Sequence, residues 1–479
     1  MKLLAILFSV LFAIAPLASA PPQHGQSAWM LADADSGEVE LSHQSELLMK
    51  PASTQKLVTV LAGALTLGPD WRYITRLRYR GELHQGRLDG DLLIDFVGDP
   101  SFTREQLAGL LRHSGIRQIS GRVLLNQAYF DGYDRGNGWS WNDLGVCYTA
   151  PAAALILDRN CVQGALYARS GSPARATVPS HQPITVSAEV EVLNRAEREQ
   201  RFCALELDMT PPNHYHLTGC IGPRKDPWPL RFAIQDVTAW GEQLTQWALK
   251  QAGIRLSGHI EGSRLDASDW PVLGRHRSPP FASLAERILV HSDNLYADSL
   301  LRTLGAMHFE QPGSFRSGTQ AVREILEKKA NIDLGPSWLA DGSGLSAHNL
   351  LRAKDLMAVL LTISRDPRAR WLMARLPVSG ESGTLRYRKS VLSPALKGKV
   401  TAKTGTIAHV QNLAGFIDTE SGERKAFVLL QNGLSLSPEQ ADAMAEGELE
   451  WPARRFERDW LEGVIKRASI VSANQSPNN

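Results

Sequence analysis

The apolar positions near the start of the chain predict a strand hairpin followed by a helix. Residues 27–44 contain two apolar stretches on either side of a turn at Asp35-Ser36-Gly37. Apolar residues then recur three and four positions apart over residues 53–67, which is the spacing of one helix face. Ser53 is therefore expected at a helix N-terminus, with Lys56 one turn further along the same face.

Two similar helix-to-strand units lie far apart in the sequence. Residues 107–125 and 244–262 each contain Gly-Ile-Arg and Ser-Gly after a predicted helix, which indicates one domain split by an insertion. Between them, residues 165–230 are rich in Pro, Thr, Ser and alternating β-formers, typical of a small β-rich subdomain. After residue 403, two strand-like runs flank a turn, and we expect this second hairpin to share a sheet with the first.

The length of the chain requires more than one hydrophobic core. A chain of 479 residues exceeds what a single core usually organises. We predict a multidomain α/β (α+β) protein whose main domain, an antiparallel sheet flanked by helices, is interrupted by a nested two-domain insertion. The predicted division is a signal peptide at 1–20, a main domain at 21–85 and 280–479, an inserted α/β domain at 86–165 and 231–279, and a β-rich subdomain at 166–230.

Residues 1–20 have the pattern of a secretory signal peptide. Lys2 precedes an apolar run at 3–17, and Ala18-Ser19-Ala20 matches a small-x-small cleavage site, so the mature chain is expected to start at Pro21. The alternative is a retained membrane anchor, but the run is too short to span a bilayer comfortably. We expect a periplasmic protein with no integral membrane span, either soluble or loosely attached to a membrane.

Charge and cysteine content narrow the function classes further. The chain has 52 basic and 50 acidic residues, a balance that gives no electrostatic reason to expect nucleic acid as a partner. All four cysteines lie between positions 147 and 220, and three pairings are open. We favour Cys147–Cys161 with Cys203–Cys220, because short loops close more readily. A zinc site is the weaker alternative, since no Cys-x-x-Cys spacing occurs, and no cofactor or metal is expected.

Three short motifs carry the candidate chemistry. They are Ser53-Thr54-Gln55-Lys56, Ser292-Asp293-Asn294 and Lys403-Thr404-Gly405. A serine hydroxyl needs an adjacent base to become a nucleophile, and a lysine becomes that base only when its pKa falls. We therefore assign Ser53 as nucleophile and Lys56 as general base, with Lys403 as a nearby cation that helps to lower the pKa of Lys56. The order of the motifs is typical of serine acyl-transfer enzymes without a catalytic histidine.

The second and third motifs are expected to complete the pocket. The Ser292 hydroxyl is placed to relay a proton to the leaving amine, and the Asn294 amide to hydrogen-bond both Lys56 and the substrate. Asp293 is expected to have a local structural role. The third motif lies on a predicted strand, where a glycine lets substrate approach the backbone and neighbouring hydroxyl and ammonium groups receive a carboxylate. The predicted substrate-binding residues are Lys403, Thr404, Gly405 and Thr406, and the backbone N–H groups of Ser53 and Thr406 are the predicted oxyanion hole.

The chain resembles the class C low-molecular-mass penicillin-binding proteins of the type-4 D-alanyl-D-alanine carboxypeptidase/endopeptidase group. Beyond the three motifs, the resemblance rests on Leu339-Ala340-Asp341-Gly342-Ser343-Gly344-Leu345-Ser346, Gly138-Trp139-Ser140-Trp141-Asn142-Asp143, Val97-Gly98-Asp99-Pro100 and Asn412-Leu413-Ala414-Gly415-Phe416. It implies a penicillin-binding transpeptidase/β-lactamase-like main domain and hydrolysis of peptidoglycan stem peptides and cross-links through an acyl-enzyme on Ser53. β-Lactams are implied to acylate Ser53. Asp143 is a candidate partner for an ammonium group of the stem peptide, with a loop cap as the alternative. A homodimer stays open.

Two rival functions share these residues. A serine β-lactamase has the same three motifs, but the insertion after Ser53 is far too long, and the nearest Glu-x-x-Leu-Asn pattern has Val190 in place of the acid. A non-catalytic peptidoglycan-binding protein of the same fold is the other alternative. Intact Ser53, Lys56, Asn294 and Lys403 argue against it.

Overall fold

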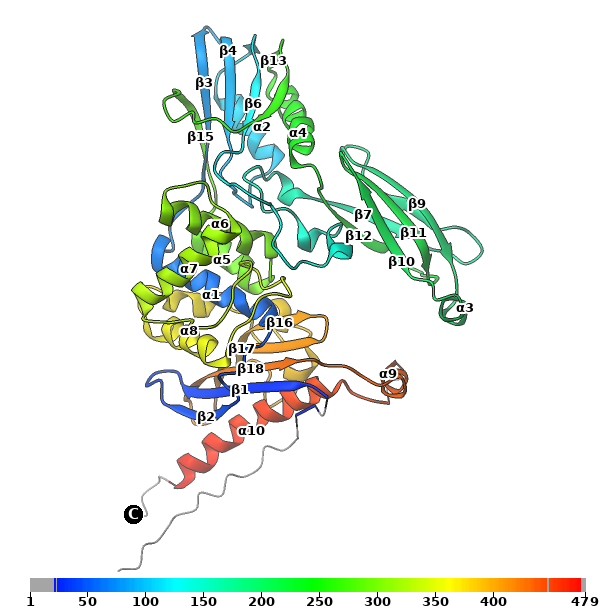
Figure 1. Cartoon of the computed structure of the whole chain (residues 1–479), viewed down its shortest axis with the longest axis vertical. Coiled ribbons are helices and arrows are strands. Elements are labelled where there is room, and N and C mark those ends of the chain that lie inside the picture. Colours follow the sequence, from blue (N-terminus) through cyan, green and yellow to red (C-terminus); the bar gives the residue numbers. More distant parts are fainter. Residues whose placement is uncertain (1–20, 23, 446–447, 475–479) are drawn as a thin grey trace, which may run out of the picture.

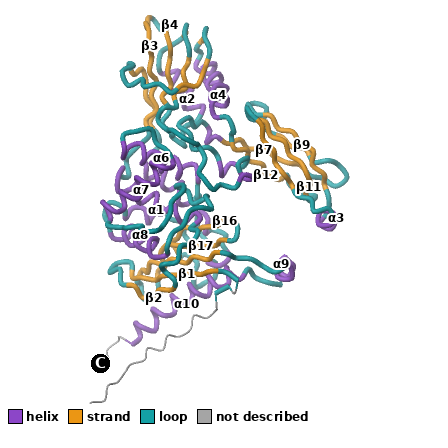
Figure 2. Tube along the Cα trace, in the orientation of Figure 1, coloured by secondary structure: helices purple, strands orange, loops and turns teal. Residues whose placement is uncertain are grey.

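The computed structural model describes residues 21–22, 24–445 and 448–474 (Figure 1). The predicted signal peptide at 1–20 lies outside the described residues. None of the helices in the described part of the chain is both long and apolar enough to cross a membrane. Figure 2 shows that helices gather in the middle of the molecule, above the lower sheet, whereas the upper part combines strands with helices and the right-hand part is mostly strands.

Both ends of the described chain build one antiparallel sheet, as the two predicted hairpins require. Its strand order is β16-β17-β18-β1-β2, and β1 pairs with β18 from Gln26↔Asn432 to Asp33↔Lys425. This pairing joins the two chain ends directly and so brings the first and third motifs together. The strands are β1 (Gln26–Asp33), β2 (Val39–His43), β16 (Val400–Ile407), β17 (Val410–Asp418) and β18 (Arg424–Asn432).

Both faces of this sheet are buried. Ala414 and Val428 point into a core shared with helices on one face, while Leu413 and Leu429 point into a second core that contains Trp460 of α10. The alternation follows from the two-residue period of a strand. The helices are α1 (Lys56–Leu67), α5 (Phe281–Val290), α6 (Asn294–Phe309), α7 (Phe315–Ala330) and α8 (Ala353–Arg365) on the first face, α10 (Pro452–Asn474) on the second, and α9 (Pro438–Ala445) in the connection between β18 and α10.

The two similar helix-to-strand units lie side by side in a second sheet. β13 pairs in parallel with β5, and β14 with β6, so the equivalent strands of the two units are neighbours. Their helices α2 and α4 share one core with the sheet. The elements are β3 (Ile74–His84), β4 (Arg87–Asp95), α2 (Arg104–His113), β5 (Gln118–Ile119), β6 (Val123–Asn126), α4 (Val237–Ala252), β13 (Arg255–Leu256), β14 (Ile260–Ser263) and β15 (Val272–Arg277).

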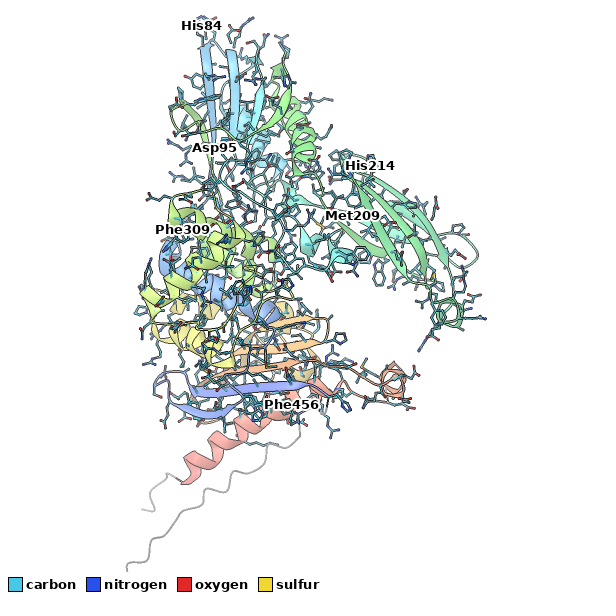
Figure 3. All side chains as sticks on the ribbon, viewed as in Figure 1. His84, Asp95, Met209, His214, Phe309 and Phe456 are labelled. Atoms are coloured by element: carbon cyan, nitrogen blue, oxygen red, sulfur yellow. A yellow bond between two sulfur atoms is a disulfide. The ribbon has the colours of Figure 1, made fainter. Side chains whose placement is uncertain are left out.

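The expected boundary at residue 86 falls inside the β3–β4 hairpin. β3 pairs with β4 and β15 in the second sheet. In Figure 3, His84 at the end of β3 lies at the far tip of this sheet, and Phe456 lies at the opposite end of the molecule. The division of the chain into domains at the positions given above stays a prediction.

The region between the two units is rich in strands, as its sequence predicts. It forms two three-stranded sheets, β10-β11-β9 and β12-β7-β8, which share a small core. Disulfides join Cys147 to Cys161 and Cys203 to Cys220, so the predicted pairing is confirmed. The elements are β7 (Cys161–Tyr167), β8 (Arg175–Thr177), β9 (Thr185–Val192), α3 (Arg195–Gln200), β10 (Leu205–Thr210), β11 (His214–Ile221) and β12 (Trp228–Ala233).

Candidate active site

Ser53 lies in a short 3-10 turn, not in the first turn of an α-helix. The turn spans Ala52–Gln55, and α1 begins at Lys56. Ala52 has a φ of 47°, in the left-handed region that is costly for a residue with a side chain. The predicted helix start is therefore displaced by three residues, but the turn runs directly into α1 and keeps Ser53 and Lys56 in contact.

The Lys56 ammonium stands at the centre of the site. Its Nζ lies 2.9 Å from Ser53 Oγ, 2.7 Å from Asn294 Oδ1 and 2.6 Å from the carbonyl oxygen of Ser343, and donates to each. The residue is fully buried. The structure thus brings together the predicted nucleophile, the predicted base and one residue of the second motif.

Burial is the main reason that the pKa of Lys56 is low. It lowers the pKa of this ammonium from 10.5 to about 8, against the opposing charges of Asp298, Asp341 and Asp293. The sequence predicts Lys403 as a nearby cation that helps to lower this pKa, whereas the largest cause is desolvation. The pKa of Lys403 is itself held well below its ordinary value, first by burial and then by the charge of Lys56.

Ser292 and Lys403 form a second hydrogen-bonded pair. Lys403 Nζ donates to Ser292 Oγ at 2.8 Å and to the carbonyl oxygen of Thr404 at 2.9 Å. Ser292 has a φ of 57°, so the second motif also contains a left-handed residue. The hydrogen bond from Lys403 holds the Ser292 hydroxyl beside β16, the strand that carries the third motif.

The remaining residues of the third motif lie along β16. Thr404 Oγ1 donates to Thr384 Oγ1 at 3.0 Å, and Thr406 is exposed. A side chain at position 405 would lie 2.6 Å from the carbonyl oxygen of Pro51. Gly405 therefore lets β16 approach the turn that carries Ser53, which is a packing reason for glycine that the sequence did not suggest.

The sequence missed two groups that support Lys56. One is the backbone carbonyl of Ser343. The other is the buried carboxylate of Asp298, whose Oδ1 accepts from the backbone N–H groups of Gly342 at 2.8 Å and Ser343 at 2.9 Å. Asp298 follows Asn294 by four residues in α6, so both lie on the same helix face. In the sequence, the signal that could have indicated this group is an Asp four residues after Asn294, among apolar residues of a predicted helix.

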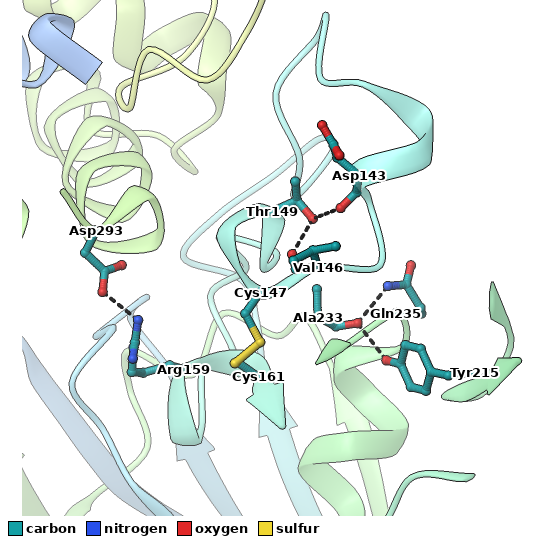
Figure 4. Close-up of a disulfide and its surroundings, with 10 residues drawn as sticks. All are labelled: Asp143, Val146, Cys147, Thr149, Arg159, Cys161, Tyr215, Ala233, Gln235 and Asp293. Carbon is teal, nitrogen blue, oxygen red and sulfur yellow. Dashed lines mark hydrogen bonds and ion pairs between the residues drawn. A yellow bond between two sulfur atoms is a disulfide. The ribbon is translucent and has the colours of Figure 1, made fainter. Parts of the chain in front are cut away.

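Asp143 lies on a loop of the inserted region that reaches the second motif. It ends a short 3-10 turn, Trp141–Asp143, and its carbonyl oxygen accepts from Thr149 Oγ1 at 2.9 Å (Figure 4). The pKa of the neighbouring Tyr148 is raised by burial and by a hydrogen bond to the Asp143 side chain. In the described residues, no group of three His, Cys, Asp or Glu side chains is arranged to hold a metal ion.

Known proteins match this chain over most of its length. The model of the D-Ala-D-Ala carboxypeptidase 3 (S13) family matches residues 13–453. The D-alanyl-D-alanine carboxypeptidase DacB of Haemophilus influenzae is 36% identical over 86% of this chain and 87% of that protein. The D-alanyl-D-alanine carboxypeptidase of an Actinomadura species is 28% identical over 85% of this chain and 78% of its own.

The fold agrees with these relatives. The crystal structure of penicillin binding protein 4 from Haemophilus influenzae matches with a TM-score of 0.84 and 34% identity, covering 93% of this chain and 97% of that one. The same protein in complex with a β-lactam matches with a TM-score of 0.80. These matches confirm the predicted penicillin-binding/β-lactamase-like fold, and the chain belongs to the D-Ala-D-Ala carboxypeptidase 3 (S13) family.

Proposed function

We propose that this protein is a serine D-alanyl-D-alanine carboxypeptidase and endopeptidase that acts on peptidoglycan stem peptides and cross-links. The observation that carries the proposal is the contact of 2.9 Å between Ser53 Oγ and the Nζ of a fully buried lysine with a lowered pKa. The carboxypeptidases named above support the same reaction.

The contacts of Lys56 determine where its lone pair points. Asn294 Oδ1 and the Ser343 carbonyl oxygen can only accept hydrogen bonds. When the amine is neutral, its two N–H groups are therefore taken by these acceptors, and its lone pair faces the Ser53 hydroxyl. This arrangement fits a general base that removes the proton of the attacking hydroxyl.

The proposed reaction has two steps. Ser53 Oγ attacks the carbonyl of a D-alanine while its proton passes to Lys56. The C–N bond breaks, and Ser292, held by Lys403, relays that proton to the departing amine. Water then hydrolyses the ester, releasing the acyl group and restoring Ser53. The backbone N–H groups of Ser53 and Thr406 are the proposed donors to the oxyanion.

The substrate-binding roles follow from position and charge. Lys403, Thr404, Gly405 and Thr406 lie on the strand beside the nucleophile, and we propose that they receive the substrate backbone and its carboxylate. Asp143 lies on the loop that reaches Asn294, and we propose it as the partner of an ammonium group on the stem peptide. A free D-alanine as leaving group makes the reaction a carboxypeptidase step, and the amine of a neighbouring stem makes it an endopeptidase step.

The location of the protein is part of the proposal. Two disulfides support an oxidising compartment, and we propose a periplasmic protein whose residues 1–20 are removed. A β-lactamase is disfavoured, because Val190 lies in β9 within the core of the β-rich region and supplies no deacylating acid.

Covalent labelling by benzylpenicillin tests the proposal. We expect intact protein to gain the mass of one penicillin on Ser53, and Ser53→Ala to lose both the adduct and the release of D-alanine from a stem pentapeptide. Ser421→Ala, in the exposed turn before β18, is the matched control and should behave like wild type. Products from purified cross-linked muropeptides report both reactions by mass. Unchanged D-alanine release by folded Ser53→Ala would overturn the proposal.

A further inference from the structure

The loop closed by the Cys147–Cys161 disulfide touches the second motif at two points. Asn294 Nδ2 donates to the carbonyl oxygen of Tyr148 at 2.8 Å, and Arg159 donates to Asp293 Oδ2 at 2.6 Å. Figure 4 shows the disulfide with Arg159 reaching out to Asp293 on the neighbouring element. Two residues of the second motif, at the start of α6, are thus contacted by residues of the insertion.

The contact with Tyr148 fixes which way the Asn294 amide faces. An amide has an acceptor end and a donor end, and the carbonyl of Tyr148 can pair only with the donor end. Asn294 Oδ1 is thereby directed at Lys56 Nζ, 2.7 Å away. A reversed amide would present N–H groups to the lysine and would remove one of the two acceptors that aim its lone pair at Ser53.

The contact with Arg159 holds the residue between Ser292 and Asn294. Asp293 is 8% exposed and precedes α6, but its carboxylate does not cap that helix. Instead Oδ2 accepts from Arg159 and, at 3.1 Å, from Arg287 of α5. The local structural role predicted for Asp293 therefore depends on one arginine from the insertion and one from a neighbouring helix.

The backbone that presents Arg159 is strained. Asp158, Arg159 and Asn160 have φ values of 53°, 62° and 46°, three consecutive left-handed residues with side chains. Such a run is costly and persists only where surrounding contacts hold it, and strain of this kind gathers at functional sites.

Both neighbours of Arg159 are anchored inside the insertion. The Asp158 carboxylate pairs with Arg104 of α2. The buried Asn160 amide donates to the carbonyl oxygens of Pro151 at 3.2 Å and Leu155 at 3.1 Å. Arg159 is left to point outward, with its side chain 42% exposed and directed at Asp293.

We propose that this disulfide-closed loop, residues 147–161, is a positioning element of the active site, which orients Asn294 through the Tyr148 carbonyl and holds Asp293 through Arg159. The inference rests on the proposed acylation of Ser53. Because the loop acts through Asn294, which orients Lys56 and is also a predicted partner of the substrate, its loss slows acylation more than it weakens the initial binding of a small β-lactam. The active site built around Ser53 and Lys56 is therefore incomplete without the insertion.

The chain offers a matched pair of variants as a test. Cys147→Ser with Cys161→Ser opens the positioning loop, whereas Cys203→Ser with Cys220→Ser opens the other disulfide, in the β-rich region. Stopped-flow acylation by benzylpenicillin, which carries no ammonium group for Asp143, separates the binding constant from the acylation rate constant. We expect the first pair to lower the rate constant roughly threefold to tenfold, the effect of about one hydrogen bond, with a smaller change in the binding constant, and the second pair to leave both unchanged.

Arg159→Ala tests the same element with its disulfide intact. We expect a slower acylation step, with partial recovery in Arg159→Lys, which keeps the charge at Asp293. Thermal unfolding of every variant shows whether each remains folded. Equal acylation rate constants in wild type, the opened loop and Arg159→Ala would overturn the inference, as would equal losses from both disulfide pairs. Absence of any adduct in wild type would instead overturn the proposed function.

Discussion

The lowered pKa of Lys56 predicts a strong pH dependence of acylation. A lysine with its ordinary pKa of 10.5 is almost wholly charged near neutrality, whereas a pKa of about 8 leaves about one tenth of it neutral at about pH 7 and about nine tenths at about pH 9. The neutral amine is the proposed base, so the rate is expected to rise with pH through this range. We therefore expect the acylation rate constant to increase roughly tenfold between about pH 7 and about pH 9, with a midpoint near the pKa.

Stopped-flow acylation by benzylpenicillin at constant ionic strength measures this profile. Circular dichroism across the same range shows that the fold persists, and the spontaneous alkaline hydrolysis of penicillin is subtracted. Lys56→Ala should lose the rising limb, because no amine remains beside Ser53. Added methylamine should restore part of the rate in proportion to its unprotonated fraction. A flat profile, or one that falls between these pH values, would refute the assignment of Lys56 as general base.

Two further predictions concern the groups around the base. Gly344 has a φ of +78°, and a side chain there would lie 1.9 Å from the carbonyl oxygen of the residue before Ser53, so Gly344→Ala should abolish acylation and lower Tm. Gly422→Ala, at a φ of +84° with no neighbour within 4 Å, should cost only roughly 1 kcal/mol and keep full acylation. Asp298→Ala leaves two buried N–H groups without their acceptor and should lower the free energy of unfolding by about 2–4 kcal/mol in urea titrations. Asp298→Asn keeps an acceptor oxygen and should lose much less.

The sequence predicted the parts of the site that depend on short spacings. Ser53 and Lys56 meet because they lie three positions apart on a helical backbone, and the 3-10 turn keeps that contact. The disulfide pairing followed from loop length, and the paired helix-to-strand units followed from their shared residues. Each of these inferences needed only local geometry or a pattern visible within a few positions.

The parts that depend on backbone atoms could not be predicted. The carbonyl of Ser343 accepts from Lys56, and the carbonyl of Tyr148 accepts from Asn294, but every residue has a carbonyl and no residue type marks these two. The reason for Gly405 was also hidden, because the atom that excludes a side chain belongs to Pro51, far away in the sequence. The chain fold alone brings these atoms together.

A lysine base makes the assembly of the site from distant segments a physical necessity. A pKa lowered from 10.5 to about 8 means that the charged form of Lys56 is roughly 3 kcal/mol less stable, relative to the neutral form, than it is in water. Burial causes this shift, because it removes the water that would solvate the ammonium group. A single helix cannot exclude that water. The loop containing Ser343, the start of α6 and strand β16 each cover part of the site, and the insertion holds the start of α6 in place. Because the loop containing Ser343 and the start of α6 also supply hydrogen-bond partners, the packing that favours the neutral amine also aims it at Ser53.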